Sequence, residues 1–147
     1  MISKGLSDDE KSYYRNLLFD NSEVFNPTDG SREEYQRYLG GLISTPLGAV
    51  RMGANQYAKF LEKKRGDLFV AARMTLEKPV FVFTAENGAV VYVKSFVKGN
   101  GKNINIVSAV IERNETGVVI TTHEERLNQI LSKIKKTSIL YEKVPGL

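Results

Sequence analysis

The chain has no cysteine and only one histidine, His123. The lack of cysteine excludes disulfides, cysteine-based zinc sites and thiol nucleophiles. It fits a cytosolic protein, and equally a cargo domain that crosses compartments. A single histidine argues against a histidine-based metal site, so we expect neither a metal nor another cofactor. No apolar run approaches the roughly 20 residues that span a membrane, and the first residues do not have the pattern of a signal peptide.

Charge is unevenly distributed along the 147 residues, although the overall composition is that of an ordinary soluble domain. Residues 1–40 contain five Lys and Arg against eight Asp and Glu, a net charge of −3, so the rest carries +7. A basic main body suggests an anionic partner, with nucleic acid the leading candidate, and a solvated lysine-rich surface is the alternative. We therefore divide the chain into an acidic helical arm, residues 1–40, and a main α+β domain, residues 41–147.

Helix signals precede the main run of strands. Ser7 and Ser31 each begin a capping box, with a glutamate three positions later. Asn55 is a candidate N-cap for a longer helix whose apolar residues recur at helical spacing, and Gly66 is a point where that helix can split. The sequence thus predicts helices over residues 8–19, 32–39 and 56–76.

A series of short, valine-rich segments follows Pro79. Asn87-Gly88 is a strong hairpin signal because both residues tolerate positive φ. The turns between the segments are short, which makes neighbouring strands antiparallel. Thr122 and Glu125 form a third capping box, which predicts a C-terminal helix directly after the fourth strand. The predicted fold is α+β, with N-terminal helices, a four- to five-stranded antiparallel sheet and that helix; its strands are residues 80–83, 90–97, 104–113, 118–122 and 138–144.

Alternation along these strands predicts a row of polar side chains on one face. If the loops close symmetrically, Lys94 lies opposite Ser108, and Ser108 lies opposite His123, with Thr121 on the same face. A slip of one residue would turn the affected side chains to the other face. Lys94 interrupts an apolar strand and needs a partner there, unless it is an edge lysine with its ammonium in water.

His123 is the strongest single candidate for chemistry. We expect it where the fourth strand meets a helix N-terminus, whose positive dipole end disfavours the imidazolium form. A neutral histidine near pH 7 can take up or release a proton. The alternative is a first-turn histidine with no special role. Phosphate-binding loops, the dinucleotide-binding glycine pattern, zinc-protease motifs, nucleophile elbows and paired carboxylates are all missing.

Four segments resemble the barnase–EndoU–colicin–RelE (BECR) class of small ribonuclease toxins, and in particular its phage-associated branch. The resemblance covers about residues 47–144 and leaves residues 1–40 outside. The segments are Leu47-Gly48-Ala49-Val50-Arg51-Met52, Asn55-Gln56-Tyr57-Ala58-Lys59, Tyr92-Val93-Lys94-Ser95-Phe96 and Val118-Val119-Ile120-Thr121-Thr122-His123.

The resemblance implies a toxin-type, metal-independent endoribonuclease of phage or prophage origin that acts on RNA, with tRNA one option. It further implies the cytoplasm of a host or target bacterial cell and an immunity or antitoxin protein as partner. The alternative is a non-catalytic module of a phage or prophage structural protein that binds nucleic acid or protein. Barnase-like enzymes use a glutamate base, and the sequence places no glutamate on the predicted row. The residues that fit the class are His123, Lys94, Thr121 and Ser108 for catalysis, and Arg51, Lys59, Lys63 and Tyr92 for substrate binding.

Overall fold

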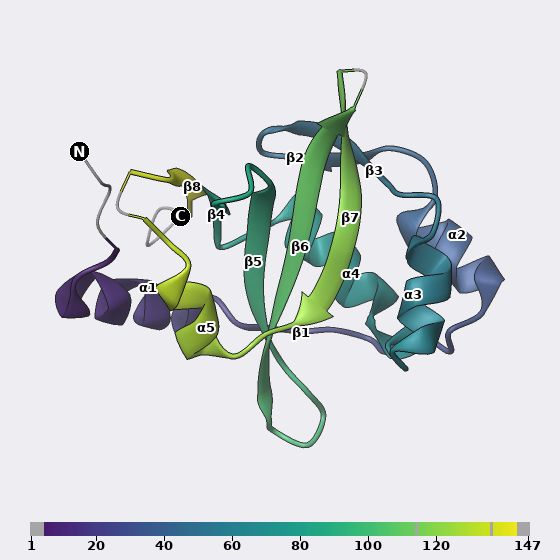
Figure 1. Cartoon of the computed structure of the whole chain (residues 1–147). Coiled ribbons are helices and arrows are strands. Elements are labelled where there is room, and N and C mark those ends of the chain that lie inside the picture. Colours follow the sequence, from purple (N-terminus) through teal and green to yellow (C-terminus); the bar gives the residue numbers. More distant parts are fainter. Residues whose placement is uncertain (1–4, 114, 136, 144–147) are drawn as a thin grey trace.

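The computed structural model describes residues 5–113, 115–135 and 137–143. One curled mixed sheet runs through the molecule, with helices on both of its faces (Figure 1). The helices are α1 (Asp8–Asp20), α2 (Arg32–Leu39), α3 (Gln56–Glu62), the 3-10 turn η1 (Gly66–Leu68), α4 (Phe69–Glu77) and α5 (Leu127–Ser132). The strands are β1 (Glu23–Val24), β2 (Ile43–Thr45), β3 (Gly48–Met52), β4 (Phe81–Thr84), β5 (Val90–Val97), β6 (Asn103–Arg113), β7 (Thr116–Glu124) and β8 (Ile139–Glu142).

The α+β class is confirmed, but the sheet is larger than predicted and is not wholly antiparallel. Its strand order is β2-β3-β7-β6-β5-β4-β8, and β1 pairs in parallel with the end of β5. β3 also pairs in parallel with β7. Such a pairing needs a long crossover. The chain between β3 and β7 provides it and contains α3, α4 and the antiparallel strands β4, β5 and β6. The short strands β1 and β2 have little apolar alternation and were not predicted, whereas β3 falls within residues 47–52, which the sequence indicates as a short extended segment. Val144, the last residue of the predicted final strand, lies outside the described residues.

The helix predictions were right at the N-terminus and less so elsewhere. Both groups of the Ser7 capping box are in place, and the Ser31 hydroxyl accepts a hydrogen bond from the Glu34 amide. The long helix is split into α3 and α4 near Gly66, as the sequence allowed. α3 ends at Glu62, and Lys64, two residues later, has a φ of 56°. A Cβ on Gly66 would lie 2.7 Å from the Gly30 Cα, so the chain approaches itself too closely there for a larger residue.

Two hydrophobic cores lie on opposite faces of the sheet. Helices α2, α3 and α4 pack over the first face against Tyr92, Phe96, Ile104 and Ile106. Helices α1 and α5 pack over the second face; their contacts there are Phe81, Phe83, Val93 and Val107. The sheet residues belong to one core or the other in strict alternation along β5 and β6, which is the period of a strand.

The predicted register of the polar row was wrong. Lys94 pairs with Ile106, while Ser108 pairs with Tyr92 on one side and Thr122 on the other. His123 pairs with Val107 and so lies on the opposite face from Lys94 and Ser108. Both loops close onto paired strand ends, Val97 with Asn103 and Arg113 with Thr116. The pairing of β6 with β7 shifts further along, between Ala109 and Val110, in a β-bulge that leaves out Ile120. A shift of one position is enough to move His123 from one face to the other.

Candidate functional site

The groove beside His123 has a volume of about 460 Å³. It opens on the sheet face that α1 and α5 cover, between the β4–β5 hairpin and the end of α5. Its floor comes from β5, β6 and β7. Apolar side chains make up much of its wall, and its polar residues are His123, Glu125, Lys133, Lys135, Ser132, Glu86 and Asn87.

His123 reaches the groove because β7 alternates. Thr121 and His123 project to the same side of the strand, and the Thr121 Oγ1 lies 2.9 Å from the histidine Nδ1. That hydrogen bond leaves Nε2 as the nitrogen available to a ligand. The side chain is 34% exposed, so the ring is partly covered and still accessible from the groove. Thr121 therefore orients the ring, as expected from their shared face.

Glu125 is the carboxylate that the sequence did not place. Its backbone amide donates to the Asn105 carbonyl oxygen at 3.0 Å, and the Asn105 side-chain amide donates to the Glu125 carbonyl at 3.3 Å. These two bonds continue the strand alternation past the end of β7, so Glu125 follows His123 on the same side. Its Oε2 lies 3.5 Å from the His123 Nε2, and its Oε1 pairs with the Lys133 ammonium at the end of α5.

The pKa of His123 is lowered from its usual 6.5, mainly because burial disfavours the charged ring. The Glu125 carboxylate raises this pKa, whereas the positive charges of Arg65 and Lys133 lower it. Burial and the two cations outweigh the carboxylate. A histidine with this lowered pKa is neutral at pH 7 and can accept a proton.

The helix-cap prediction at this junction was wrong. α5 begins at Leu127 with Arg126 as its N-cap, and no side chain caps it. The Thr122 hydroxyl instead lies 2.9 Å from the Ser108 hydroxyl inside the protein. The depressed pKa of His123 thus arises from burial and neighbouring charges rather than from a helix dipole. The alternation Thr121-His123-Glu125, extended three residues past the predicted strand end, was the signal that would have placed Glu125 in the site.

Lys94 and Ser108 lie away from the groove. The Lys94 side chain is 2% exposed, and its Nζ lies 2.6 Å from the Glu23 Oε2 and 3.0 Å from the Lys78 carbonyl oxygen at the end of α4. Ser108 is fully buried. Tyr92, predicted to bind substrate, is also buried, and its hydroxyl lies 2.8 Å from the Thr45 Oγ1. These side chains connect the sheet to the elements around it.

The predicted basic residues of the α3 region lie beside the unpaired part of β7. β3 ends at Met52, opposite Val119, and leaves the next residues of β7 without a strand neighbour on that side. The Lys59 Nζ lies 3.2 Å from the Ile120 carbonyl oxygen, and the Arg65 Nη1 lies 3.4 Å from the Thr122 carbonyl oxygen. Lys63 is exposed at the end of α3, and Arg51 is exposed on β3.

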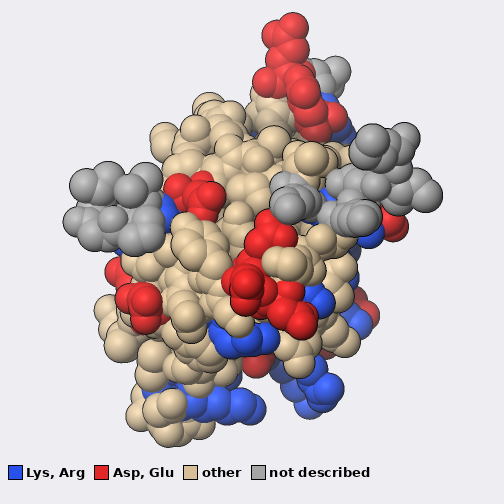
Figure 2. Space-filling view, turned by 90° about the vertical axis from the view of Figure 1, so that its left-hand side faces the viewer, with Lys and Arg blue, Asp and Glu red and all other residues tan. Residues whose placement is uncertain are grey.

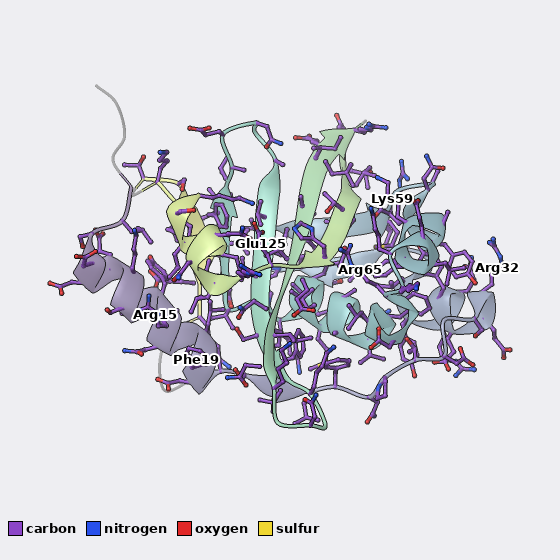
Figure 3. All side chains as sticks on the ribbon, turned by 60° about the horizontal axis from the view of Figure 1, so that its bottom comes forward. Arg15, Phe19, Arg32, Lys59, Arg65 and Glu125 are labelled. Atoms are coloured by element: carbon purple, nitrogen blue, oxygen red, sulfur yellow. The ribbon has the colours of Figure 1, made fainter. Side chains whose placement is uncertain are left out.

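Acidic side chains gather on the side of the molecule that carries α1, α5 and β8. Figure 2, which faces the side with α1, α5 and β8, shows Asp and Glu side chains gathered in the middle, with several Lys and Arg side chains at the lower edge. In Figure 3, Glu125, Arg65, Lys59 and Arg32 follow one another across the molecule from α5 towards α2. An anionic ligand of the groove is therefore favoured along the α3 side.

The described residues include no group of three or more His, Cys, Asp or Glu side chains arranged to hold a metal ion. None of the helices described is long and apolar enough to cross a membrane. Comparisons of the chain with protein-family models, with curated proteins and with solved structures returned no significant match.

Proposed function

We propose that the chain is a metal-independent endoribonuclease whose reactive centre is the groove beside His123. The observation that supports this best is the surroundings of the only histidine. A hydroxyl fixes its Nδ1, a carboxylate lies beside its Nε2, and its pKa is lowered so that the ring is neutral at pH 7. A neutral imidazole that lies in a groove beside a carboxylate suits general acid–base catalysis.

His123 and the polar residues that act on it each have a role in such a reaction. The RNA 2′-oxygen attacks phosphorus, the bond from phosphorus to the 5′-oxygen breaks, and the proton lost by the 2′-hydroxyl returns to the leaving 5′-oxygen. The His123 Nε2 carries that proton, and Glu125 stabilises the imidazolium formed in between. Lys133 and Arg65, whose charges already act on His123, stabilise the negative charge that develops on the phosphate oxygens. Thr121 holds the ring in place.

This assignment replaces part of the predicted catalytic set. Glu125 and Lys133 take the positions that the sequence gave to Ser108 and Lys94, which lie on the other face of the sheet. Lys59, Lys63 and Arg51 remain proposed contacts to RNA phosphates. From the resemblance to the phage-associated toxins we further propose that the enzyme acts in a bacterial cytoplasm, on tRNA or another RNA, and is held in check by an immunity protein.

The test is incubation of the purified protein with total RNA in the presence of EDTA, which removes divalent metal ions. We expect discrete fragments from the wild type and at least 10²-fold slower cleavage by His123→Ala, because the proton carrier is lost. Lys102→Ala, a substitution in the β5–β6 loop outside the groove, is the matched control and should cleave like the wild type. Equal cleavage by His123→Ala and the control would refute the assignment.

A second candidate function is RNA binding without cleavage. The observation in its favour is the charge of the groove, where Glu86 and Glu125 offset Lys133 and Lys135, while the unpaired cations lie outside it along α3. A gel-shift titration run beside the cleavage assay separates the two functions. RNA that is bound at micromolar protein and stays intact supports the binding module.

A further inference from the structure

A second hollow, with a volume of about 370 Å³, lies on the α2 side of the molecule. Its walls come from α2, the turn that follows α2, the end of β3 and the beginning of α3. Two arginines, Arg32 and Arg51, line it together with Tyr35, Tyr57 and exposed Leu42. No acidic residue is among the described residues that line it. The hollow is therefore both cationic and aromatic.

Arg32 has a fixed and partly open position in this hollow. Its guanidinium carbon lies 4.7 Å from the centre of the Tyr57 ring. The Tyr57 hydroxyl donates to the Gly30 carbonyl oxygen at 3.0 Å, and the centre of the Tyr35 ring lies 5.0 Å from the centre of the Tyr57 ring. The Tyr57 ring beneath Arg32 is therefore held from two sides. Arg32 is exposed, which leaves its outer surface accessible. A guanidinium plane held in this way can stack on an unpaired base.

Arg51 supplies the second feature, a charge without a carboxylate partner. It is exposed on β3 opposite Val118, and among the described residues no carboxylate lies within ion-pair distance of it or of Arg32. A guanidinium of this kind suits a phosphate, which it can bind through two parallel hydrogen bonds.

Strand β7 connects the hollow, beside the end of β3, with His123 on the other face of the sheet. The Met52 end of β3 pairs with Val119 of β7, and His123 follows four residues later, about 13 Å along the strand at a rise of about 3.3 Å per residue. Lys59 lies between them, at the Ile120 carbonyl oxygen. An extended nucleic-acid strand that reaches His123 along β7 can therefore continue past Lys59 to the hollow.

We propose that this hollow binds one nucleotide of a single-stranded RNA at a position away from the cleaved bond. The base stacks on Arg32 above Tyr57, and a phosphate pairs with Arg51. The ligand must be single-stranded, because a base inside a duplex is not free to stack on a side chain. The inference rests on the proposed ribonuclease function, since it takes the bound strand to be the substrate. A free mononucleotide has the same chemistry, and the experiment distinguishes the two.

The experiment measures binding of a labelled 2′-O-methyl RNA oligonucleotide, which cannot be cleaved because its 2′-oxygen cannot attack. We expect Arg32→Ala to weaken binding on the order of tenfold, as for the loss of one stacked base. Arg32→Lys keeps the charge and loses the plane, so it should also bind weakly. Arg51→Ala should lower the slope of log affinity against log salt by about 0.7, the value for one phosphate contact of a single strand. Lys102→Ala is the control, and thermal melting checks that each variant is folded.

Unchanged oligonucleotide affinity in folded Arg32→Ala and Arg51→Ala would overturn the inference, whether or not the protein cleaves RNA. Binding of adenosine monophosphate as strong as that of the oligonucleotide would also overturn it, and would make the hollow a site for free nucleotides. Arginine-dependent binding of the oligonucleotide without any cleavage by the wild type would support the hollow as a nucleotide site and reject the ribonuclease function. With active enzyme, the two arginine substitutions should raise KM for long RNA and leave kcat unchanged.

Discussion

Removing the Glu23 carboxylate should destabilise the fold, because the buried Lys94 ammonium then loses its counter-charge, and Glu23→Gln tests this. The substitution removes the only carboxylate that pairs with the Lys94 ammonium among the described residues, leaving the Lys78 carbonyl oxygen. Breaking a fully buried ion pair from one side costs about 3–5 kcal/mol. The Glu23 side chain is 44% exposed, so water screens the pair and can partly replace the carboxylate. We therefore expect a loss of about 2 kcal/mol.

Urea denaturation measures this loss directly, and a loss of about 2 kcal/mol corresponds to a Tm lower by about 6 °C for a chain of this length. Lys94→Met is the matched variant, because it removes the buried charge, keeps the volume and leaves Glu23 in contact with water. It should cost less than about 1 kcal/mol. The double variant should be about as stable as Lys94→Met alone, since no ammonium is left without a partner. A Lys94→Met variant less stable than Glu23→Gln would refute this reasoning. So would a double variant whose loss of unfolding free energy equals the sum of the losses in the two single variants.

The same pair should make the fold sensitive to acid. Lys94 lowers the pKa of Glu23 below its usual 4.5, mainly through their hydrogen bond. The stabilisation from this shift is present above about pH 4.5 and is lost as the pH falls through the lower, folded-state pKa. The difference in unfolding free energy between the wild type and Glu23→Gln should therefore shrink with acid. A difference that stays constant from pH 7 to pH 3 would contradict the shift.

Three further predictions concern the His123 groove. Glu125→Gln should lower the pKa of His123, because it removes a negative charge that favours the imidazolium, and Lys133→Met should raise this pKa, because it removes a positive charge that opposes the imidazolium. NMR titration of the only histidine measures both pKa shifts, and shifts in the reverse directions would be inconsistent with the geometry. Relative to His123→Ala, the wild type should lose unfolding free energy as the pH falls below about 6.5, because the unfolded chain binds the proton more readily than the folded one; equal pH dependence of the two proteins in urea denaturation would contradict this. Asn105→Ala should slow RNA cleavage and shift the His123 pKa. The Asn105 side chain accepts a hydrogen bond from the Ser95 hydroxyl and donates one to the Glu125 carbonyl oxygen, and so holds the segment that carries Glu125. An unchanged pKa and an unchanged rate would exclude that positioning role.

Local signals in the sequence were sufficient for the features that depend on neighbouring residues. The Ser7 capping box depends on hydrogen bonds within one turn, and the Asn87-Gly88 hairpin depends on a backbone conformation, with φ of 86° at Gly88. Both were predicted correctly. The split of the long helix was also visible at Gly66, although the close approach of Gly30 that accompanies it comes from a distant part of the chain.

The site was harder to predict because it depends on register. The bulge that leaves out Ile120 comes from the pairing of β6 with β7, and no local pattern shows it. It turns His123 to the face opposite Lys94. Glu125 lies beside His123 because the extended backbone continues past β7, where local pattern had placed a helix cap. The parallel pairing of β3 with β7 likewise joins segments far apart in the chain. Thr121 beside His123 was predictable, because residues two apart in a strand share a face.

The pH dependence of RNA cleavage is the measurement that decides whether His123 carries the proton. The NMR titration of His123 gives the pKa of the ring, which should lie below 6.5, and kcat/KM measured in EDTA should rise with pH through that same value as the ring becomes neutral. The residual activity of His123→Ala, at least 10²-fold lower, should not follow this titration. A rate that is flat across the measured pKa of His123, or full activity in His123→Ala, would contradict the assignment of the groove as the reactive centre.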